Sequence, residues 1–183
     1  MRRIYLFMMV SLDGYFEGAG HDLSWHAVDD EFNKFAHEQL RNTGAILFGK
    51  RTYQMMAAFW PTPQGQAVDR ETANAMNALP KYVASDEPFE TKWNNTAVLS
   101  GDVLSEVSKL KSESGKDVAI LGSNMLCVSL MERGLVDEFR IMVNPCAISR
   151  GTPLFAGLER LMRFKLLDSR IFKNGNVLNR YAS

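Results

Sequence analysis

The chain has 183 residues, of which 46% are hydrophobic and 23% charged, a composition typical of soluble globular domains. Lysine and arginine (21) balance aspartate and glutamate (21), so the long-range attraction that a nucleic-acid partner requires is missing. No segment reaches the ~18 apolar residues that span a bilayer, and we expect no membrane partner and a cytoplasmic location. Cys127 and Cys146 are too few for a disulfide framework or a structural zinc site, and no metal site is expected.

Short apolar segments alternate with segments of helical periodicity along most of the chain. Strands are predicted at residues 4–10, 45–48, 81–84, 97–99, 118–121, 138–143, 164–172 and 177–181. Helices are predicted at residues 29–41, 52–59, 67–77, 102–112 and 124–133, and residues 11–20 are predicted to form a loop. Asn174-Gly175 favours a tight hairpin between the last two strands. This order predicts one α/β domain over residues 1–183, with a mostly parallel central sheet flanked by helices and an antiparallel C-terminal hairpin.

Two glycines stand where a predicted strand gives way to a helix. Gly49 follows Ile-Leu-Phe and precedes Lys50, Arg51 and Thr52, and Gly122 follows Ala-Ile-Leu and precedes Ser123 and Asn124. In α/β sheets, ligands lie beyond the carboxyl ends of strands, where helix N-termini present free amides and glycine lets the backbone approach a phosphate. Each junction alone would also suit an ordinary β–α turn, since neither is a Walker loop or a GxGxxG fingerprint. Two junctions in one short chain favour a doubly anchored ligand such as a dinucleotide.

An ordered set of short motifs extends this interpretation. They are Ser-Leu-Asp-Gly-Tyr at 11–15, Gly-Lys-Arg-Thr-Tyr at 49–53, Ser85, Gly-Ser-Asn-Met-Leu at 122–126, Gly-Leu-Val-Asp-Glu at 134–138, Asn-Pro at 144–145 and Gly-Thr-Pro-Leu-Phe at 151–155. In this order they closely resemble the dihydrofolate-reductase-like superfamily. The nearer resemblance is to the bacterial branch shared with the C-terminal reductase domain of riboflavin-biosynthesis proteins, and it runs from about residue 4 to 181.

The resemblance implies an NADPH-binding reductase that forms a homodimer. Three motifs correspond to cofactor-binding segments of the family, and Ser85 corresponds to a position beside the adenosine. The implied cofactor-binding residues are Ser11, Asp13 and Gly14 over the nicotinamide; Gly49, Lys50, Arg51 and Thr52 at the phosphates, with the basic residue near the adenosine 2′-phosphate; and Gly122, Ser123, Asn124, Met125 and Leu126 around the pyrophosphate. Asp86 and Glu87 depart from this picture, because they would repel a 2′-phosphate if they faced it. Ser149 stands where relatives tend to carry glycine.

The substrate side carries weaker signals. In dihydrofolate reductases a carboxylate on the first helix, shortly after a tryptophan, contacts the pterin, and here Asp30 follows Trp25 by five residues. These two are the candidate catalytic residues, although Asp29 or Asp30 would equally serve as a helix N-cap. His26 is either a proton donor or a solvent-facing loop histidine.

Several large side chains could either line a pocket or belong to the hydrophobic core. Trp60, Tyr53 and Phe59 either wall a pocket or form an aromatic core. We expect four methionines in the core, namely Met8, Met9, Met55 and Met56. The apolar strand at 138–143 would supply either a dimer interface or interior sheet.

The sequence alone leaves three functions open. The first is a reductase of a small heterocyclic substrate, resembling 5-amino-6-(5-phosphoribosylamino)uracil reductase of riboflavin biosynthesis. In full-length relatives a zinc deaminase precedes the reductase, and its pattern, H-x-E with a paired P-C-x-x-C, does not occur in this chain. The second is dihydrofolate reductase proper, disfavoured by the long insert between Trp60 and Lys81 and by Gly-Ser-Asn in place of a double glycine. The third is a non-catalytic nucleotide-binding protein that retains the fold.

Overall fold

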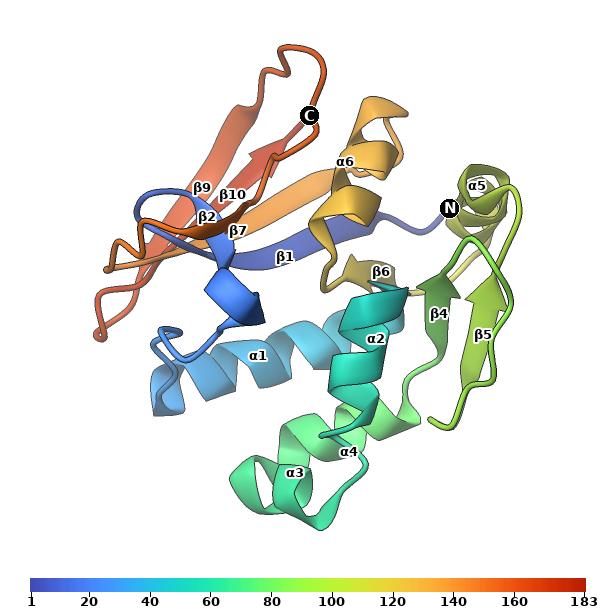
Figure 1. Ribbon diagram of the computed structural model, residues 1–183, viewed down its shortest axis with the longest axis horizontal. Coiled ribbons are helices and arrows are strands. Elements are labelled where there is room, and N and C mark those ends of the chain that lie inside the picture. Colours follow the sequence, from blue (N-terminus) through green and yellow to red (C-terminus); the bar gives the residue numbers. More distant parts are fainter.

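The computed structural model describes residues 1–183, and its centre is an eight-stranded sheet with helices on both faces (Figure 1). The strands of this sheet lie in the order β5-β4-β3-β6-β1-β7-β10-β9. They are β1 (Ile4–Ser11), β3 (Thr43–Gly49), β4 (Lys81–Ala84), β5 (Thr96–Leu99), β6 (Asp117–Ile120), β7 (Glu138–Asn144), β9 (Lys165–Ile171) and β10 (Val177–Ala182). Two more strands, β2 (Tyr15–Gly18) and β8 (Gly151–Pro153), form a separate antiparallel ribbon.

The strands from β5 to β7 pair in parallel, and β10 pairs antiparallel with both β7 and β9. The predicted hairpin joins β9 to β10, with Gly175 at a φ of 90°, a left-handed value that glycine adopts without strain. The predicted fold class is therefore confirmed. The open choice for residues 138–143 is also resolved, because β7 lies inside the sheet between β1 and β10, and the edge strands are β5 and β9.

The helices divide between the two faces of the sheet. They are α1 (Asp30–Asn42), α2 (Lys50–Ala57), α3 (Pro63–Val68), α4 (Arg70–Ala78), α5 (Val103–Ser112) and α6 (Asn124–Glu132), with the short 3₁₀ helix η1 (Ala19–His21) after β2. Helices α5 and α6 pack on the face that carries Leu47, while α2 and α4 pack on the face that carries Ile46. Both of these neighbouring side chains are fully buried, which explains why β3 reads as a continuous apolar run. No helix combines the length and the apolar character that crossing a bilayer requires.

Two expectations about local structure were wrong. The single helix expected at 67–77 is two helices, α3 and α4, separated at Asp69, whose backbone is extended and whose side chain accepts a hydrogen bond from the Thr72 amide as the N-cap of α4. The loop expected at 11–20 contains β2 and η1, because β8 pairs with β2 from the distant segment Gly151–Pro153. A three-residue strand has too little periodicity to be detected in the sequence.

Candidate active site

The two glycine junctions lie side by side at the carboxyl edge of the sheet, because β3 and β6 are neighbours. The amide of Gly49 donates a hydrogen bond to the carbonyl of Gly122 over 3.1 Å. Both glycines are sterically required: a Cβ at Gly49 would lie 2.5 Å from Ser123 Oγ, and a Cβ at Gly122, where φ is 112°, would lie 3.0 Å from Thr52 Oγ1. The two junctions thus form one continuous backbone surface.

The helices that start at these junctions differ from the others at their N-termini. Side chains cap α1, α3, α4 and α5, through Asp29, Thr62, Asp69 and Asp102 respectively. Helices α2 and α6 begin after Gly49 and Ser123 with no side-chain cap. Their first amides therefore remain available, and the helix dipoles favour negative charge at these ends. The two adjacent uncapped N-termini, which we call the anion-binding edge, are therefore suited to a negatively charged group.

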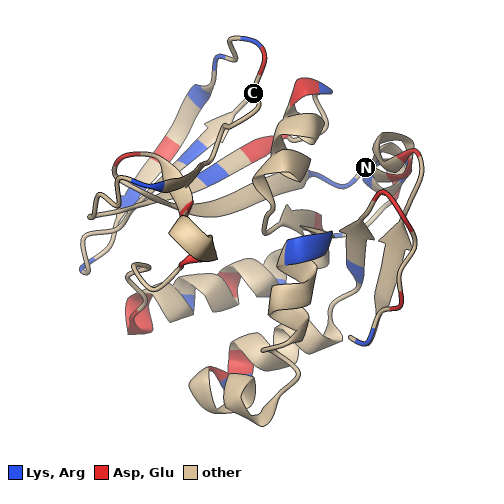
Figure 2. Cartoon of the chain, viewed as in Figure 1, with Lys and Arg blue, Asp and Glu red and all other residues tan.

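Further predicted residues lie along the same edge. Ser85 follows β4 and is buried, with its Oγ donating to the carbonyl of Glu87. Lys50 opens α2 and places its Nζ 5.0 Å from the centre of the Phe89 ring, in the segment that follows β4. Figure 2 shows basic residues at the start of α2. Lys50 is therefore the cation on the Ser85 side of the edge, while Asp86 is exposed. The sequence identified Lys50 and Arg51 as the basic residues of the edge, but it did not show that their side chains point to different sides.

The loop that follows β1 is tied to a second loop. The Asp13 carboxylate accepts hydrogen bonds from the Ser11 hydroxyl and from the amides of Ile148 and Ser149. The hydrogen bond from Ser11 lowers the pKa of Asp13. Ser149 has a φ of 59°, a left-handed value that favours glycine, and the hydrogen bond from its amide to Asp13 holds it there.

At the start of α6, Asn124 is buried, Met125 is exposed and Leu126 belongs to the core. Leu126 can therefore contribute to the anion-binding edge through its backbone only.

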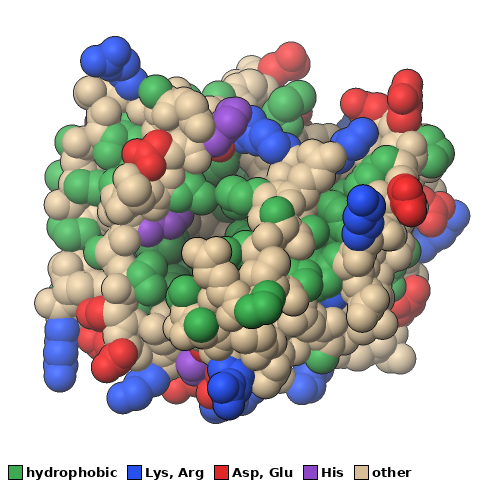
Figure 3. Space-filling model, turned by 60° about the horizontal axis from the view of Figure 1, so that its bottom comes forward, with side chains coloured by type: hydrophobic (Ala, Val, Ile, Leu, Met, Phe, Trp, Pro, Cys, Tyr) green, Lys and Arg blue, Asp and Glu red, His purple; other side chains and the backbone are tan.

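A cavity of about 470 Å³ adjoins the edge at Thr52 and Gly122. Its walls come from β1, from the segment around η1, and from α1 and α2, and 15 of its 22 lining residues are hydrophobic, so a ligand inside would be largely shielded from water. Figure 3 shows the hollow, with hydrophobic side chains on its walls and histidine side chains among them. The lining includes five methionines, Met8, Met9, Met55, Met56 and Met76. Met8 and Met9 are buried in the core, as expected, and Met56 packs against it, but all three also border the cavity. The expectation fails for Met55, which is 42% exposed.

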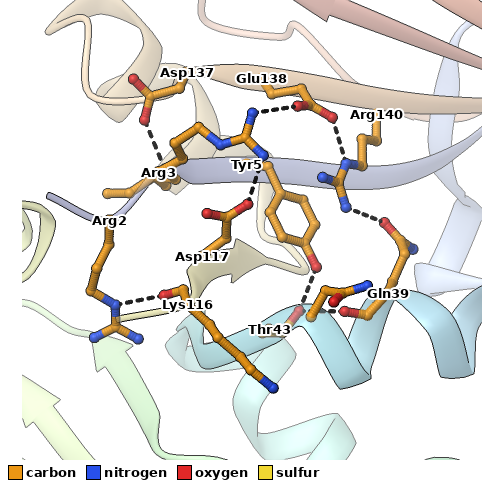
Figure 4. Close-up of polar contacts among 12 residues, drawn as sticks. Arg2, Arg3, Tyr5, Gln39, Thr43, Lys116, Asp117, Asp137, Glu138 and Arg140 are labelled. Carbon is orange, nitrogen blue, oxygen red and sulfur yellow. Dashed lines mark hydrogen bonds and ion pairs between the residues drawn. The ribbon is translucent and has the colours of Figure 1, made fainter. Parts of the chain in front are cut away.

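A polar network supports one end of this cavity (Figure 4). Arg140 donates to buried Glu138 over 2.7 Å and to the lining residue Gln39 over 3.0 Å. Its guanidinium lies 3.7 Å from the centre of the Tyr5 ring, which also lines the cavity. Burial alone would raise the pKa of Glu138, but hydrogen bonds from Arg180 and Arg140 hold it below its usual value. This end of the cavity is rigid and its charges are paired internally.

Glu17 and Arg51 bridge the mouth of the cavity. Arg51 Nη2 lies 2.8 and 2.9 Å from the two carboxylate oxygens of Glu17, which also accepts from Thr152 Oγ1 and contacts His21 Nδ1 at 3.1 Å. Burial favours the neutral acid, yet these partners keep the pKa of Glu17 below its ordinary value. A Cβ at Gly151 would overlap the Glu17 carbonyl oxygen, so the ribbon needs glycine here. Arg51 thus faces the cavity rather than the Ser85 side of the edge.

His26 is the lining residue whose polar atoms are least satisfied. Its Nε2 is buried without a hydrogen-bond partner, and burial lowers the pKa of the ring to about 4, so it is neutral at pH 7. The backbone beside it is fixed, because Asn144 Oδ1 accepts from the Ala27 amide and Asn176 Nδ2 donates to the Ala27 carbonyl. His26 is therefore a cavity residue, and the reading of it as a solvent-facing loop histidine was wrong.

The two candidate catalytic residues from the sequence do not line the cavity. Asp30 is exposed in the first turn of α1, where Asp29 is the N-cap that accepts from the Phe32 amide. Trp25 donates from Nε1 to the Asp22 carbonyl and packs edge-on against His26. α1 presents Phe32, Ala36, Gln39 and Leu40 to the cavity instead. The spacing from Trp25 places the Asp30 carboxylate on α1, a helix that lines the cavity, but on a face of α1 that does not line it.

The three aromatic residues that the sequence assigned either to a pocket wall or to an aromatic core have different positions. Trp60 lines the cavity, Tyr53 is buried in the core against Phe48, and Phe59 does neither, packing edge-on against Trp60.

The sheet order and the adjacent glycine junctions define the dihydrofolate-reductase-like α/β fold. Dihydrofolate reductase from Enterococcus faecalis, solved in complex with NADP(H), matches with a TM-score of 0.67 and 12% identity over 98% of this chain and 95% of that one. A pyrimidine reductase-like protein from Corynebacterium diphtheriae matches with a TM-score of 0.71 and 16% identity, covering 99% and 91%. Within this fold, the chain belongs to the family of the RibD C-terminal domain, whose model matches residues 2–178. The uncharacterised Bacillus subtilis protein YyaP is 30% identical over 178 residues, or 96% of this chain and 92% of that protein.

Proposed function

We propose that this protein is an NADPH-dependent reductase that reduces a small molecule inside the apolar cavity. The observation that carries the proposal is the pair of uncapped helix N-termini, α2 and α6, which meet beside the mouth of the cavity. A dinucleotide has two phosphates that need such amides, and its ring must reach a water-excluded space for hydride transfer. When bound, NADPH supplies the hydride.

This chain's residues would divide the cofactor between them. The amides at the start of α6 would bind the pyrophosphate, and those at the start of α2, with Lys50, would bind phosphate on the adenosine side near Ser85. The loop containing Asp13 would cover the nicotinamide end. Thr52 and Gly122 belong both to this edge and to the cavity lining, which supports a cofactor that runs from one into the other.

A small heterocyclic substrate fits the family, but the cavity favours neither of its two familiar forms. A pterin is anchored by a carboxylate on the first helix, and α1 presents none to the cavity. An aminopyrimidine ribotide carries a phosphate, and the one lysine or arginine in the lining, Arg51, is already bound by Glu17. We therefore propose a reductase with the cofactor of the family and a different substrate.

The homodimer also remains a proposal. The edge strand β9 is exposed along its whole length and carries Leu166, Leu167 and Ile171, an apolar surface that supports self-association. Sedimentation of wild type beside Leu167→Lys tests it, and a wild-type monomer would contradict it.

Titration of the protein with NADPH and, separately, with NADH tests the function. Binding is monitored by thermal shift and by quenching of tryptophan fluorescence, for which Trp60 in the cavity lining is well placed. We expect micromolar NADPH binding that Gly122→Asp abolishes, because the new carboxylate would stand where the pyrophosphate binds. Gly134→Asp is the control for a substitution at positive φ, since Gly134 shares the positive φ of Gly122, has nothing within 4 Å of an added Cβ and lies at the other end of α6. Binding without turnover of any carbonyl or heterocyclic compound would favour the non-catalytic alternative, and a wild type that binds neither nucleotide would exclude the reductase.

A further inference from the structure

The charged side chains of the cavity lie at its mouth and are paired with each other. Glu17 is the one carboxylate of the lining and Arg51 its one lysine or arginine, and Arg51 Nη2 lies 2.8 Å from Glu17 Oε1. His21 contacts the same carboxylate, and His26, with a pKa of about 4, is neutral at pH 7. A charged ligand in the interior would lose its hydration without meeting a free counter-charge, and the penalty for such a transfer is large. The interior therefore favours an uncharged molecule.

The walls of the interior restrict the shape of that molecule. Methionines contributed by β1, α2 and α4 can adjust to a flat surface, since their side chains are unbranched and polarisable. Phe7, Phe32 and Trp60 add aromatic rings to the lining. A volume of about 470 Å³ accommodates a molecule of one or two rings beside the reactive end of a cofactor.

Gln39 of α1 brings one oriented polar group to this lining, at the end of the cavity that the Arg140 network supports (Figure 4). Its Oε1 accepts from Arg140 Nη1 over 3.0 Å, and because a guanidinium can only donate, this bond fixes which arm of the carboxamide faces Arg140. The other arm, Nε2, donates no hydrogen bond within the protein. Unlike the orphaned nitrogen of His26, it is not among the fully buried polar atoms, so a ligand atom can reach it.

The surroundings of Gln39 hold this donor in place before a ligand arrives. Arg140 is itself fixed, since its Nε donates to buried Glu138 over 2.7 Å and its guanidinium lies 3.7 Å from the centre of the Tyr5 ring. The Gln39 backbone is fixed as well, because its carbonyl accepts from Thr43 Oγ1 over 2.8 Å. A donor that is already oriented loses little conformational freedom when a ligand binds it.

Resting on the function proposed above, we propose that the substrate is an uncharged, flat and largely apolar ring molecule whose hydrogen-bond acceptor atom is bound by Gln39 Nε2. The apolar walls reject charge, and Gln39 determines specificity by requiring an acceptor at its end of the cavity. A pterin or a pyrimidine ribotide has polar groups along several edges, most of which would lose water against apolar side chains and remain unpaired.

Four bicyclic probes of similar size test the substrate class on the full chain. Naphthalene has no polar atom, quinoline has one ring nitrogen as an acceptor and is uncharged at neutral pH, 2-naphthoate is an anion, and N-methylquinolinium is a cation. Binding is measured by calorimetry with and without NADP⁺. We expect naphthalene and quinoline to bind, with both charged probes at least about tenfold weaker than quinoline.

The variant Gln39→Glu tests the donor while keeping an acceptor for Arg140, which protects the fold. It should weaken quinoline about fivefold to tenfold and change the affinity for naphthalene by less than about twofold. Gln39→Met, which removes the donor without adding charge, should give the same selective loss. Gln54→Glu, on the exposed face of α2 outside the cavity, adds the same charge and is the matched control. Equal losses for quinoline and naphthalene would show a packing effect and overturn the role of Gln39.

The same titrations separate this inference from the proposed function. If NADPH binds but no probe binds, or a charged probe binds as tightly as quinoline, the substrate class is wrong and the cofactor assignment survives. If quinoline binds and NADPH does not, the reductase fails and the cavity keeps its preference for uncharged ligands.

Discussion

The anion-binding edge and the cavity beside it are built in opposite ways. At the edge, backbone amides provide the binding groups, and Gly49 and Gly122 matter because they leave space. In the cavity, large apolar side chains from distant segments provide the surface, and polar groups are mostly paired with one another. Under the proposed function, the edge binds a chemical group common to many ligands, whereas the cavity determines which molecule reacts. Substitutions should separate these two roles.

The largest effect is expected from closing the edge. In Gly49→Ala the new Cβ would lie 2.5 Å from Ser123 Oγ and would push the two junctions apart, so NADPH affinity should fall about 100-fold. The double variant Gly49→Ala/Ser123→Gly removes the clash and should recover most of the binding. A double variant as weak as the single one would show that the junctions are not in contact in solution.

The pH dependence of the unfolding free energy tests the burial of His26 in the cavity wall. The folded pKa of His26, about 4, lies below its ordinary 6.5. Between these values the unfolded chain binds a proton that the folded chain does not, and stability therefore falls as pH drops from 6.5 toward 4. The loss should be about 1–3 kcal/mol, since the ring is partly exposed. Urea unfolding of His26→Gln should show a smaller slope of stability against pH over this range. Equal slopes for wild type and His26→Gln would place the ring in water.

A smaller effect should distinguish the two basic residues of the edge. Lys50 lies on the Ser85 side, so Lys50→Ala should weaken NADPH by about tenfold and leave NADH nearly unchanged. Arg51→Ala should change the two affinities equally, because its guanidinium faces Glu17. The family resemblance implies a basic residue near the 2′-phosphate, and from the sequence alone we would expect Arg51→Ala to weaken NADPH more than NADH. Selective loss of NADPH in Arg51→Ala would return that role to Arg51.

The smallest effect is expected at Asp30. Its side chain is exposed and outside the cavity, so Asp30→Asn should change the affinity for NADPH and the rate of NADPH oxidation by less than about twofold. A large loss would mean that the start of α1 moves toward the substrate.

The sequence predicted the edge well because its geometry depends on local residue types. A glycine between an apolar strand and a helix leaves a clear signal, and adjacent parallel strands bring Ser11, Gly49, Ser85 and Gly122 to one edge. The sheet class, the hairpin at Gly175 and the Asp29 cap follow from equally local rules.

The cavity was less predictable because it depends on which face of each element turns inward. Asp30 and Phe32 are two positions apart on α1, and only Phe32 lines the cavity. Glu17 reaches the mouth through the pairing of β2 with β8, which are more than a hundred residues apart in sequence. The orphaned nitrogen of His26 depends on packing around the whole ring and leaves no pattern in the sequence.

The ion pair between Glu17 and Arg51 has a thermodynamic consequence. Arg51 reaches Glu17 with a single nitrogen, Nη2, so a ligand anion that recruits this nitrogen competes directly with the ribbon that holds Glu17. Coupling of this kind is reciprocal: an anion that displaces Glu17 loosens the β2–β8 ribbon, and a change that loosens the ribbon, such as Thr152→Val, raises the affinity for that anion by the same factor. Segments more than a hundred residues apart in the chain thereby share one equilibrium.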